Sequence, residues 1–167
     1  MGLHAAAADA VFVSPDYRNF PQGGISDMVD DVSLMLEWVV THIDKYGGDA
    51  NNVTVVGQSA GAHLLSLALL RQAVTVAQGG RDLSWRPSDF RRFVGLGGVY
   101  DLTGLEGHLH ARGLYRWLLR AMLPPCATLA DYCPLCPSWG HSTPPATSCR
   151  CASACRGRCC SSTATAT

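Results

Sequence analysis

Lysine and long apolar runs are scarce in this chain of 167 residues. Lys45 is its single lysine, against twelve arginines, and the charged residues sum to a formal net charge of zero. No stripe of basic residues interleaved with aromatic residues occurs, so we expect no nucleic-acid partner. The longest apolar run, Leu64 to Leu70, is interrupted by Ser66 and is far too short to cross a bilayer. The sequence therefore predicts a soluble chain without a membrane segment.

Cysteine is absent from the first 125 residues, and all eight cysteines lie between Cys126 and Cys160. From Pro124 onward the chain also lacks Val, Ile, Phe, Met, Glu, Lys, Asn and Gln, and it holds six of the nine prolines. A segment of this composition cannot bury an apolar core. We therefore divide the chain into a domain, residues 1–123, and a tail, residues 124–167, that we expect to be disordered.

The cysteines of the tail allow three interpretations. Cys133 and Cys136 have the spacing of half a zinc site, and further ligands are available at His141, Cys149 and Cys151. The second half of the tail lacks a matching pair, so we expect no metal. A disulfide cluster would require an oxidising compartment, which nothing in residues 1–123 indicates. The interpretation we favour is that an altered reading frame or a retained intron produced this composition.

The first 123 residues alternate between strand-like and helix-like patterns. β-branched and apolar runs predict short buried strands, and apolar positions recurring every three or four residues predict helices. The expected elements are strands at Ala10–Ser14, Val53–Val56 and Phe93–Leu96, helices at Ser26–Tyr46, from the residues after Gly61 to about Arg71 and at Gly113–Met122, and a surface excursion at Ala73–Asp89. Strand and helix alternating at these lengths predict an α/β fold with parallel strands and right-handed crossovers.

The most informative segment is a G-x-S-x-G motif, formed by Gly57, Gln58, Ser59, Ala60 and Gly61. A strand-like run precedes it and a helix-like run follows it, which is the context of a nucleophile elbow. The two glycines would allow strand and helix to approach closely and leave the Ser59 hydroxyl exposed. Ser59 is thus the candidate nucleophile, and the Ala60 amide would face the oxyanion of a tetrahedral intermediate.

Other polar residues lie near the expected carboxyl ends of the strands, where parallel sheets place their chemistry. Asp16, Tyr17 and Arg18 follow the first strand, and a structural ion pair is the favoured role for Asp16 and Arg18. Asp101 follows the third strand and is expected to be a turn or cap residue.

Three histidines are also candidates for a pocket. His63, one turn beyond the elbow serine, is expected to pack or to lie on a polar face rather than to act as a base. His108 and His110 are two apart, which on a helix places them on different faces and argues against a shared metal.

Several of these segments together resemble the α/β-hydrolase carboxylesterases, and in particular the plant-type isoprenylcysteine α-carbonyl methylesterases. The resemblance covers about residues 7–120. It rests on the segments S-P-D-Y-R-N-F-P-Q-G (14–23), I-S-D-M (25–28), Y-G-G-D (46–49), G-Q-S-A-G-A-H (57–63) and H-L-H-A-R-G-L-Y (108–115). D-Y-R and G-G-D occur in many esterases of this superfamily, whereas D-Y-R-N-F-P-Q-G and H-x-H-x-R-G-L-Y are more particular to the methylesterases.

The resemblance implies a carboxylic ester hydrolase in which Ser59 attacks the carboxyl methyl ester of a prenylated cysteine, without a cofactor. It implies an endoplasmic reticulum or Golgi membrane location for intact relatives. For His108 and His110 it implies a pocket or cap element, with an ordinary surface loop as the alternative. The family's H-G-G oxyanion motif lies upstream of the matched region, and its triad aspartate and histidine lie downstream. Asp131 and His141 are only ten residues apart, with no strand between them, and do not replace that pair. We therefore expect an incomplete sheet and an inactive fragment. The alternative is a non-catalytic fragment or a cysteine-rich protein for metal binding or interaction.

Overall fold

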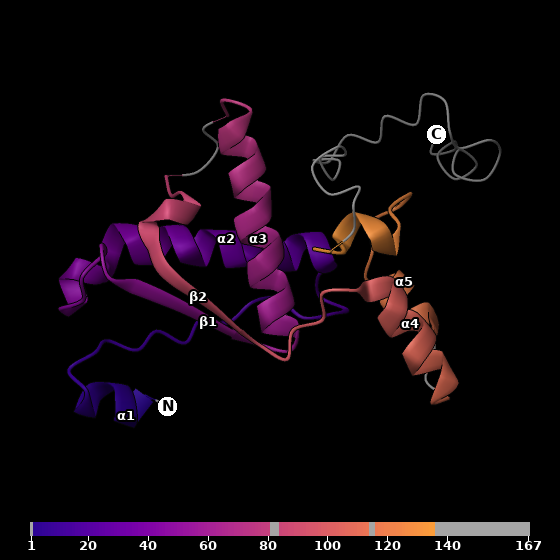
Figure 1. Ribbon diagram of the computed structural model, residues 1–167, viewed down its shortest axis with the longest axis horizontal. Coiled ribbons are helices and arrows are strands. Elements are labelled where there is room, and N and C mark those ends of the chain that lie inside the picture. The colour runs from indigo at the N-terminus through magenta and orange to yellow at the C-terminus, as the bar shows by residue number, and fades with distance from the viewer. Residues whose placement is uncertain (1, 81–83, 114–115, 136–167) are drawn as a thin grey trace, which may run out of the picture. The chain divides into compact units, whose positions relative to one another are not determined.

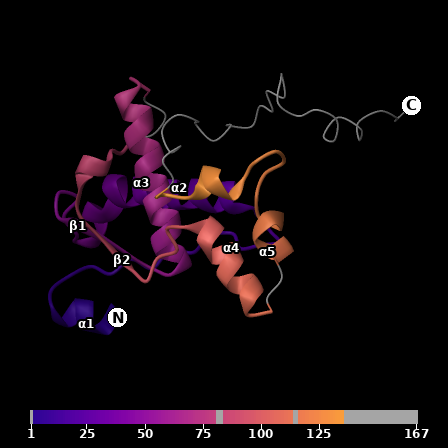
Figure 2. The ribbon, with the colours of Figure 1, turned by 45° about the vertical axis from the view of Figure 1, so that its right-hand side comes forward.

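The computed structural model describes residues 2–80, 84–113 and 116–135. These residues fall into two compact units, one ending at Tyr100 and the other beginning at Asp101. Figures 1 and 2 show the elements of each unit.

The first unit contains two strands and three α-helices among its described residues. In chain order its elements are α1 (Gly2–Ala7), α2 (Ile25–His42), the 3-10 helix η1 (Ile43–Tyr46), β1 (Val53–Gln58), α3 (Ala60–Ala77), the 3-10 helix η2 (Pro87–Asp89) and β2 (Phe90–Leu96). In both ribbon views α2 and α3 lie on the same side of the two strands. Helix α3 packs against both strands, and α2 packs against α3.

The two strands form a parallel pair, as the sequence predicts. Val56 is the register partner of Val94, and Gln58 is the register partner of Leu96. Helix α3 and the segment after it make the crossover from β1 to β2. The α/β expectation is therefore confirmed, and the sheet has two strands within the part of the chain that the structure describes.

Helix α2 forms where the apolar positions recur every three or four residues. Its buried apolar side chains lie on one face and are Ile25, Met28, Val29, Val32 and Leu36. The Asp27 carboxylate accepts a hydrogen bond of 2.9 Å from the amide of Gly24, which satisfies a backbone donor at the start of the helix. Gly47 ends η1 in the left-handed region, at φ 81°, where a glycine costs least.

The core of the first unit lies between α2, α3 and the start of β2. Ala62, Leu64, Leu67 and Ala68 of α3 are buried. Trp85 is fully buried, its ring centroid is 5.5 Å from that of Phe90, and its carbonyl accepts a 2.9 Å bond from the Gln72 amide. The expected surface excursion at 73–89 is wrong in two respects, because α3 continues to Ala77 and Trp85 fills the core. The apolar Val74 and Val76 extend the helical pattern beyond Arg71.

The first expected strand is absent. Residues 10–14 are neither helix nor strand, and Val11, Phe12 and Val13 are 43%, 48% and 36% exposed. A strand is stable only when a neighbouring strand satisfies its backbone groups, and in the described residues β1 pairs with β2 alone. The β-branched composition of residues 10–14 is therefore insufficient by itself.

The second unit is mainly helical where it is described. Its elements are α4 (Leu102–Ala111), α5 (Arg116–Ala121) and the 3-10 helix η3 (Leu129–Tyr132). An ion pair joins α4 to α5, with Arg120 Nε 2.7 Å from Glu106 Oε1. The expected helix at 113–122 is present in shortened form as α5, whereas α4 was not expected.

Residues 124–135 also belong to this second unit. Leu129, Tyr132 and Cys133 are buried, and the Thr128 amide donates a 2.7 Å bond to Asp131 at the start of η3. These residues are ordered, contrary to the expectation of a disordered tail from Pro124. The remainder of that tail, residues 136–167, lies outside the described residues.

Helix α3 is the one helix among the described residues that is long and apolar enough to cross a membrane. Its contacts with β1 and α2 are those of a core helix in a globular fold. Length and composition alone therefore do not make it a membrane span.

Candidate nucleophile elbow

Ser59 occupies the single position between β1 and α3. Its backbone has φ 50° and ψ −117°, a combination that non-glycine residues rarely adopt. Two bonds hold this turn in place. The Ser59 amide donates to the Leu96 carbonyl at 2.9 Å, and the His63 amide donates to the Ser59 carbonyl at 3.2 Å. The serine is exposed at the carboxyl end of the parallel pair.

Gly57 explains how the chain reverses so sharply. A Cβ atom added there would lie 2.6 Å from the amide nitrogen of Ala62 and 2.7 Å from its Cα. Both atoms belong to the backbone of α3, so they could not move aside. At Gly61 an added Cβ would meet nothing within 4 Å of the described residues. The close approach expected of both glycines is therefore present at Gly57 and absent at Gly61.

The amide of Ala60 begins α3, directly after the serine. The first amides of a helix have no intrahelical acceptor and carry the positive end of the helix dipole. The Ser59 side chain makes no capping bond to them. The Ser59 hydroxyl therefore makes no capping bond to the Ala60 amide, which directly follows it in the chain.

His63 lies in the first turn of α3 and is buried. The expected alternatives for this residue were a packing role and a polar helix face, and its burial favours the packing role. His42, at the end of α2, stacks on Trp38 with ring centroids 5.5 Å apart and lies 2.6 Å from the Thr41 hydroxyl. His42 precedes β1, and His63 lies on the helix that follows Ser59, so neither comes from a loop after another strand, where a base for Ser59 would be expected.

Asp101, His108 and His110 belong to the second unit. Asp101 caps α4, and its Oδ1 accepts a 2.9 Å bond from the Gly104 amide, which confirms the expected cap role. His108 and His110 are exposed residues of α4. The surface-loop alternative for these two histidines is therefore wrong, while their placement on different sides of a helix agrees with the expected geometry.

Asp16, Tyr17 and Arg18 lie in the irregular segment before α2. Together with Gln22 and Asp31 they line a shallow hollow of about 320 Å³. Asp16 accepts a 2.9 Å bond from the neighbouring Tyr17 amide. It does not pair with Arg18.

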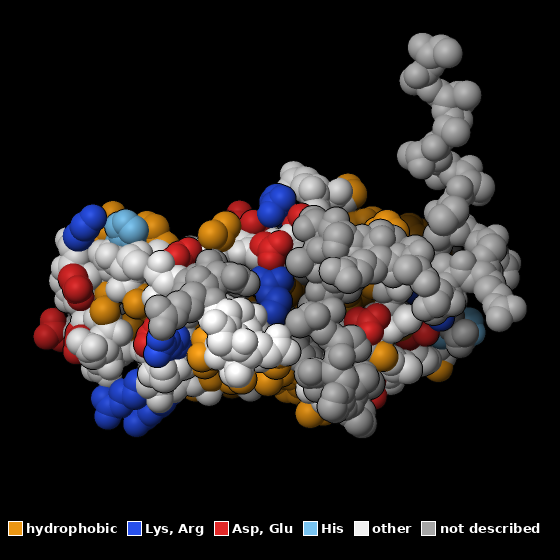
Figure 3. Space-filling model, turned by 90° about the horizontal axis from the view of Figure 1, so that it is seen from above, with side chains coloured by type: hydrophobic (Ala, Val, Ile, Leu, Met, Phe, Trp, Pro, Cys, Tyr) orange, Lys and Arg blue, Asp and Glu red, His pale blue; other side chains and the backbone are white. Residues whose placement is uncertain are grey.

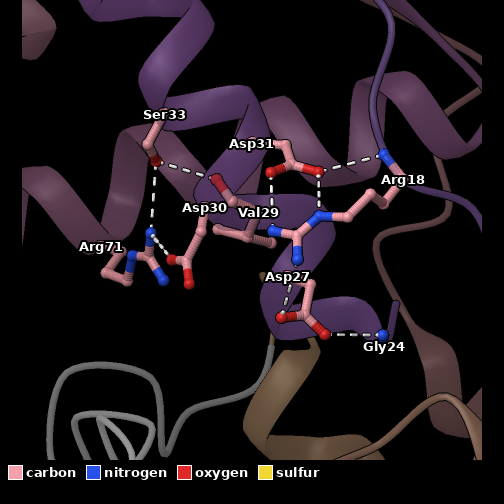
Figure 4. A network of polar contacts seen from close by, with 8 residues as sticks. All are labelled: Arg18, Gly24, Asp27, Val29, Asp30, Asp31, Ser33 and Arg71. Carbon is pink, nitrogen blue, oxygen red and sulfur yellow. Dashed lines mark hydrogen bonds and ion pairs between the residues drawn. The ribbon is translucent and has the colours of Figure 1, made fainter. Parts of the chain in front are cut away.

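Arg18 pairs with the first turns of α2 (Figure 4). Its Nε and Nη2 donate to the two carboxylate oxygens of Asp31 at 2.8 and 2.7 Å, and its backbone amide donates to the same residue at 3.0 Å. Asp27 lies 3.5 Å from Nη1. The structural ion pair expected for Arg18 exists, but its partners are on α2.

These contacts shift the pKa values of Asp31 and Arg18. The hydrogen bonds from Arg18 lower the pKa of Asp31 below its ordinary value, and the same side-chain bond raises the pKa of Arg18. Arg18 therefore fastens the segment before α2 to that helix.

The sequence pattern alone does not indicate this role of the aspartates in α2. Asp27, Asp30 and Asp31 suit the first turn of a helix, and that fit gave no reason to seek partners elsewhere. In the structure Asp30 lies 2.6 Å from Arg71 of α3, and Arg71 also donates a 3.2 Å bond to the Ser33 hydroxyl (Figure 4). The signal available was Arg71, which has no acidic neighbour in sequence, whereas Arg18 has Asp16 two residues before it and was expected to pair there.

The described residues contain no group of three or more His, Cys, Asp or Glu side chains suited to a metal ion. Cys126 is exposed, and Cys133 is buried with its Sγ 3.9 Å from Asp101 Oδ1. The candidate ligands Cys136, His141, Cys149 and Cys151 lie outside the described residues.

In the view of Figure 3, basic and acidic side chains are interspersed among the coloured residues.

A sharp turn at the serine of a G-x-S-x-G motif, between a parallel strand and its crossover helix, is typical of the α/β-hydrolase fold. A family model described as the α/β-hydrolase fold matches residues 1–83, and the chain belongs to this fold. An esterase B from Lactobacillus rhamnosis, solved with a tributyrin phosphonate inhibitor, superposes with a TM-score of 0.53 at 21% identity. The superposition covers 70% of this chain and 36% of that one.

The curated relatives that match this chain include methylesterases and other ester hydrolases. A probable isoprenylcysteine alpha-carbonyl methylesterase of Arabidopsis thaliana is 43% identical over 123 residues, and a second Arabidopsis isoprenylcysteine alpha-carbonyl methylesterase is 44% identical over the same length. A probable carboxylic ester hydrolase of Mycobacterium tuberculosis is 37% identical over 109 residues. The chain thus resembles the plant methylesterases, as the sequence motifs predict. It spans 29% of the length of both Arabidopsis relatives.

Proposed function

We propose that this chain carries the nucleophile-bearing part of a carboxylic ester hydrolase, with Ser59 as the nucleophile. The observation that supports this most directly is the backbone of Ser59, which is held in a rarely populated conformation by the Leu96 and His63 contacts. A strained backbone that the surrounding structure maintains is typical of functional turns. The ester hydrolases among the relatives supply the reaction class.

The proposed chemistry begins when the Ser59 Oγ attacks the ester carbonyl carbon. A general base takes the hydroxyl proton as the carbon–oxygen bond forms. The amide of Ala60 then donates a hydrogen bond to the oxyanion of the tetrahedral intermediate. Collapse of the intermediate expels the alcohol and leaves an acyl-serine, which water hydrolyses.

The substrate we propose is a carboxyl methyl ester, with a prenylated cysteine as the acyl part. This assignment follows from the plant relatives, which are isoprenylcysteine alpha-carbonyl methylesterases by name. The leaving alcohol would then be methanol. No cofactor takes part in this sequence of steps.

We further propose that the chain alone turns over esters poorly. His42 stacks on Trp38 before β1, and His63 is buried on the helix that follows Ser59, so neither comes from a loop after another strand, as a triad base does. A serine without a base has little nucleophilic character at neutral pH. Loss of a triad member in serine hydrolases lowers turnover by about 10⁴ to 10⁶.

Two measurements test the two halves of this proposal. The isolated chain should hydrolyse short p-nitrophenyl esters no faster than its Ser59→Ala variant. A chimera in which residues 7–120 replace the corresponding part of an active methylesterase should hydrolyse those esters, and Ser59→Ala in the chimera should abolish the activity.

Ser66→Ala is the matched control in the chimera. Ser66 is a buried serine of α3, and its hydroxyl donates a 2.8 Å bond to the Ala62 carbonyl. Its removal should leave turnover nearly unchanged. A folded chimera that retains activity without Ser59 would contradict the assigned nucleophile, and a clear activity of the isolated chain over Ser59→Ala would contradict the missing base.

A further inference from the structure

A short motif that overlaps the start of β1 has no part in the proposed reaction. Asn52, Val53 and Thr54 form the pattern Asn-x-Thr, whose middle residue is not proline. This is the acceptor pattern for N-linked glycosylation. The chain has two other asparagines, and neither fits the pattern. Asn19 is followed by Phe20 and Pro21, and Asn51 is followed by Asn52 and Val53.

The structure presents Asn52 in the manner that a glycan acceptor requires. Asn52 is exposed and closes a turn in which its amide donates a 3.0 Å bond to the Asp49 carbonyl. Thr54, the third residue of the pattern, is also exposed. An acceptor asparagine must lie on a surface loop because the attached sugar is bulky and hydrated.

The two polar atoms of the Asn52 side chain have different surroundings. Its Oδ1 accepts a 2.8 Å bond from Arg91 Nη1, at the start of β2. Its Nδ2 has no hydrogen-bond partner among the described residues. Glycosylation consumes one hydrogen of Nδ2 and leaves Oδ1 as an acceptor, so the contact with Arg91 is compatible with a sugar at this position.

We propose that Asn52 is an N-linked glycosylation site. Nδ2 of Asn52 forms a bond to the anomeric carbon of a lipid-pyrophosphate-linked oligosaccharide. The bond between that carbon and the pyrophosphate oxygen breaks, the lipid pyrophosphate leaves with the electron pair, and Nδ2 loses one proton. The donor class restricts the reaction to the lumen of the secretory pathway.

The position of Asn52 separates the glycan from the candidate nucleophile. Asn52 precedes the first residue of β1, and Ser59 follows its last residue. Six strand residues span roughly 20 Å, at about 3.3 Å per residue. The sugar would therefore lie at the amino end of the sheet and would leave the elbow open to substrate. This inference does not depend on the ester hydrolase proposal.

The test directs the full chain into the secretory lumen of cultured plant cells with a cleavable signal. A short Asn-Gly-Thr tag at the carboxyl terminus reports that the chain has met the transferase. We expect two glycans on the chain, removed by a peptide N-glycosidase that converts the acceptor asparagines to aspartate. Mass spectrometry of the released peptides should locate one conversion at Asn52 and the other in the tag.

Four variants define the result. Asn52→Gln and Thr54→Val should each retain the tag glycan and lose the other. Thr54→Ser keeps the pattern, and Asn51→Gln changes the neighbouring asparagine outside it, so both should retain two glycans. A chain glycosylated in the tag alone overturns the proposal, as does a second glycan that survives in Asn52→Gln.

Discussion

Gly57 approaches the backbone of Ala62 so closely that a Cβ atom on Gly57 would lie 2.6 Å from the Ala62 amide nitrogen. The contact joins the end of β1 to the first turn of α3 across the candidate nucleophile. This close approach allows the chain to turn sharply at Ser59, between the end of β1 and the start of α3.

The first prediction follows from this contact. Gly57→Ala should destabilise the first unit by about 1–3 kcal/mol, because the added methyl group overpacks against atoms that cannot rotate away. Unfolding in urea, followed by circular dichroism, measures the change.

Gly61→Ala is the matched control, four residues along the same motif. Nothing among the described residues lies within 4 Å of a Cβ there, and Gly61 is in a helix, where alanine is favoured by up to about 1 kcal/mol. This variant should be neutral or more stable. Equal destabilisation by both substitutions would contradict the close strand–helix approach at Gly57.

The second prediction concerns the pair of Arg18 and Asp31. Because the pKa of Asp31 is lowered in the fold, its ionised form stabilises the protein above the unfolded pKa of about 4. That contribution is lost as the pH falls through the lower folded value. The unfolding midpoint of the wild type should therefore fall on acidification below pH ~4 more steeply than that of Asp31→Asn.

A second comparison separates this pair from general surface charge. Asp16→Asn removes another carboxylate that lines the same hollow. The Asp16 carboxylate accepts a hydrogen bond from the adjacent Tyr17 amide. At neutral pH this substitution should lower the midpoint less than Asp31→Asn does. The reverse order would contradict the fastening role of Arg18.

The third prediction concerns Trp85, whose side chain is fully buried and whose Nε1 has no partner among the described residues. Trp85→Ala should cost about 3–5 kcal/mol, because it removes a large buried ring and leaves a cavity beside Phe90. Trp38, 39% exposed on α2, is the control, and its replacement by alanine should cost much less. Urea unfolding compares the two, and similar losses would place Trp85 outside the core.

The elbow was predictable from sequence because its requirements are local. A strand, a single serine and a helix follow one another directly in the sequence, and the backbone at Ser59 makes the sharp turn that this order implies. The pairing of β1 with β2 was predictable for a related reason, since two β-branched runs joined by a helix favour a parallel crossover.

The absence of a strand at 10–14 follows from the incomplete sheet that the resemblance implies and not from the local pattern, and the partners of Arg18 were not predictable from sequence. A strand depends on a neighbour that may be far away in sequence, and Val11 to Val13 carry the right residues without one. Arg18 reaches Asp31 across 13 positions, and helix periodicity gives no sign of that distance. The burial of Trp85 was also not predictable, because its neighbours in sequence are polar and give no sign that the side chain fills the core.

The last prediction concerns the face of the strand pair opposite α3. Gly57 faces α3, so the alternating residues Val56, Val94 and Leu96 lie on the other face, where they are 54%, 38% and 46% exposed. Parallel strands are ordinarily covered on both faces, and an uncovered apolar face with free strand edges promotes association. Val94→Lys should therefore shift the isolated chain toward monomer in sedimentation velocity. Thr103→Lys adds the same charge on exposed α4 and should leave the distribution unchanged. Equal effects of the two lysines would assign the change to net charge and contradict a role for this face.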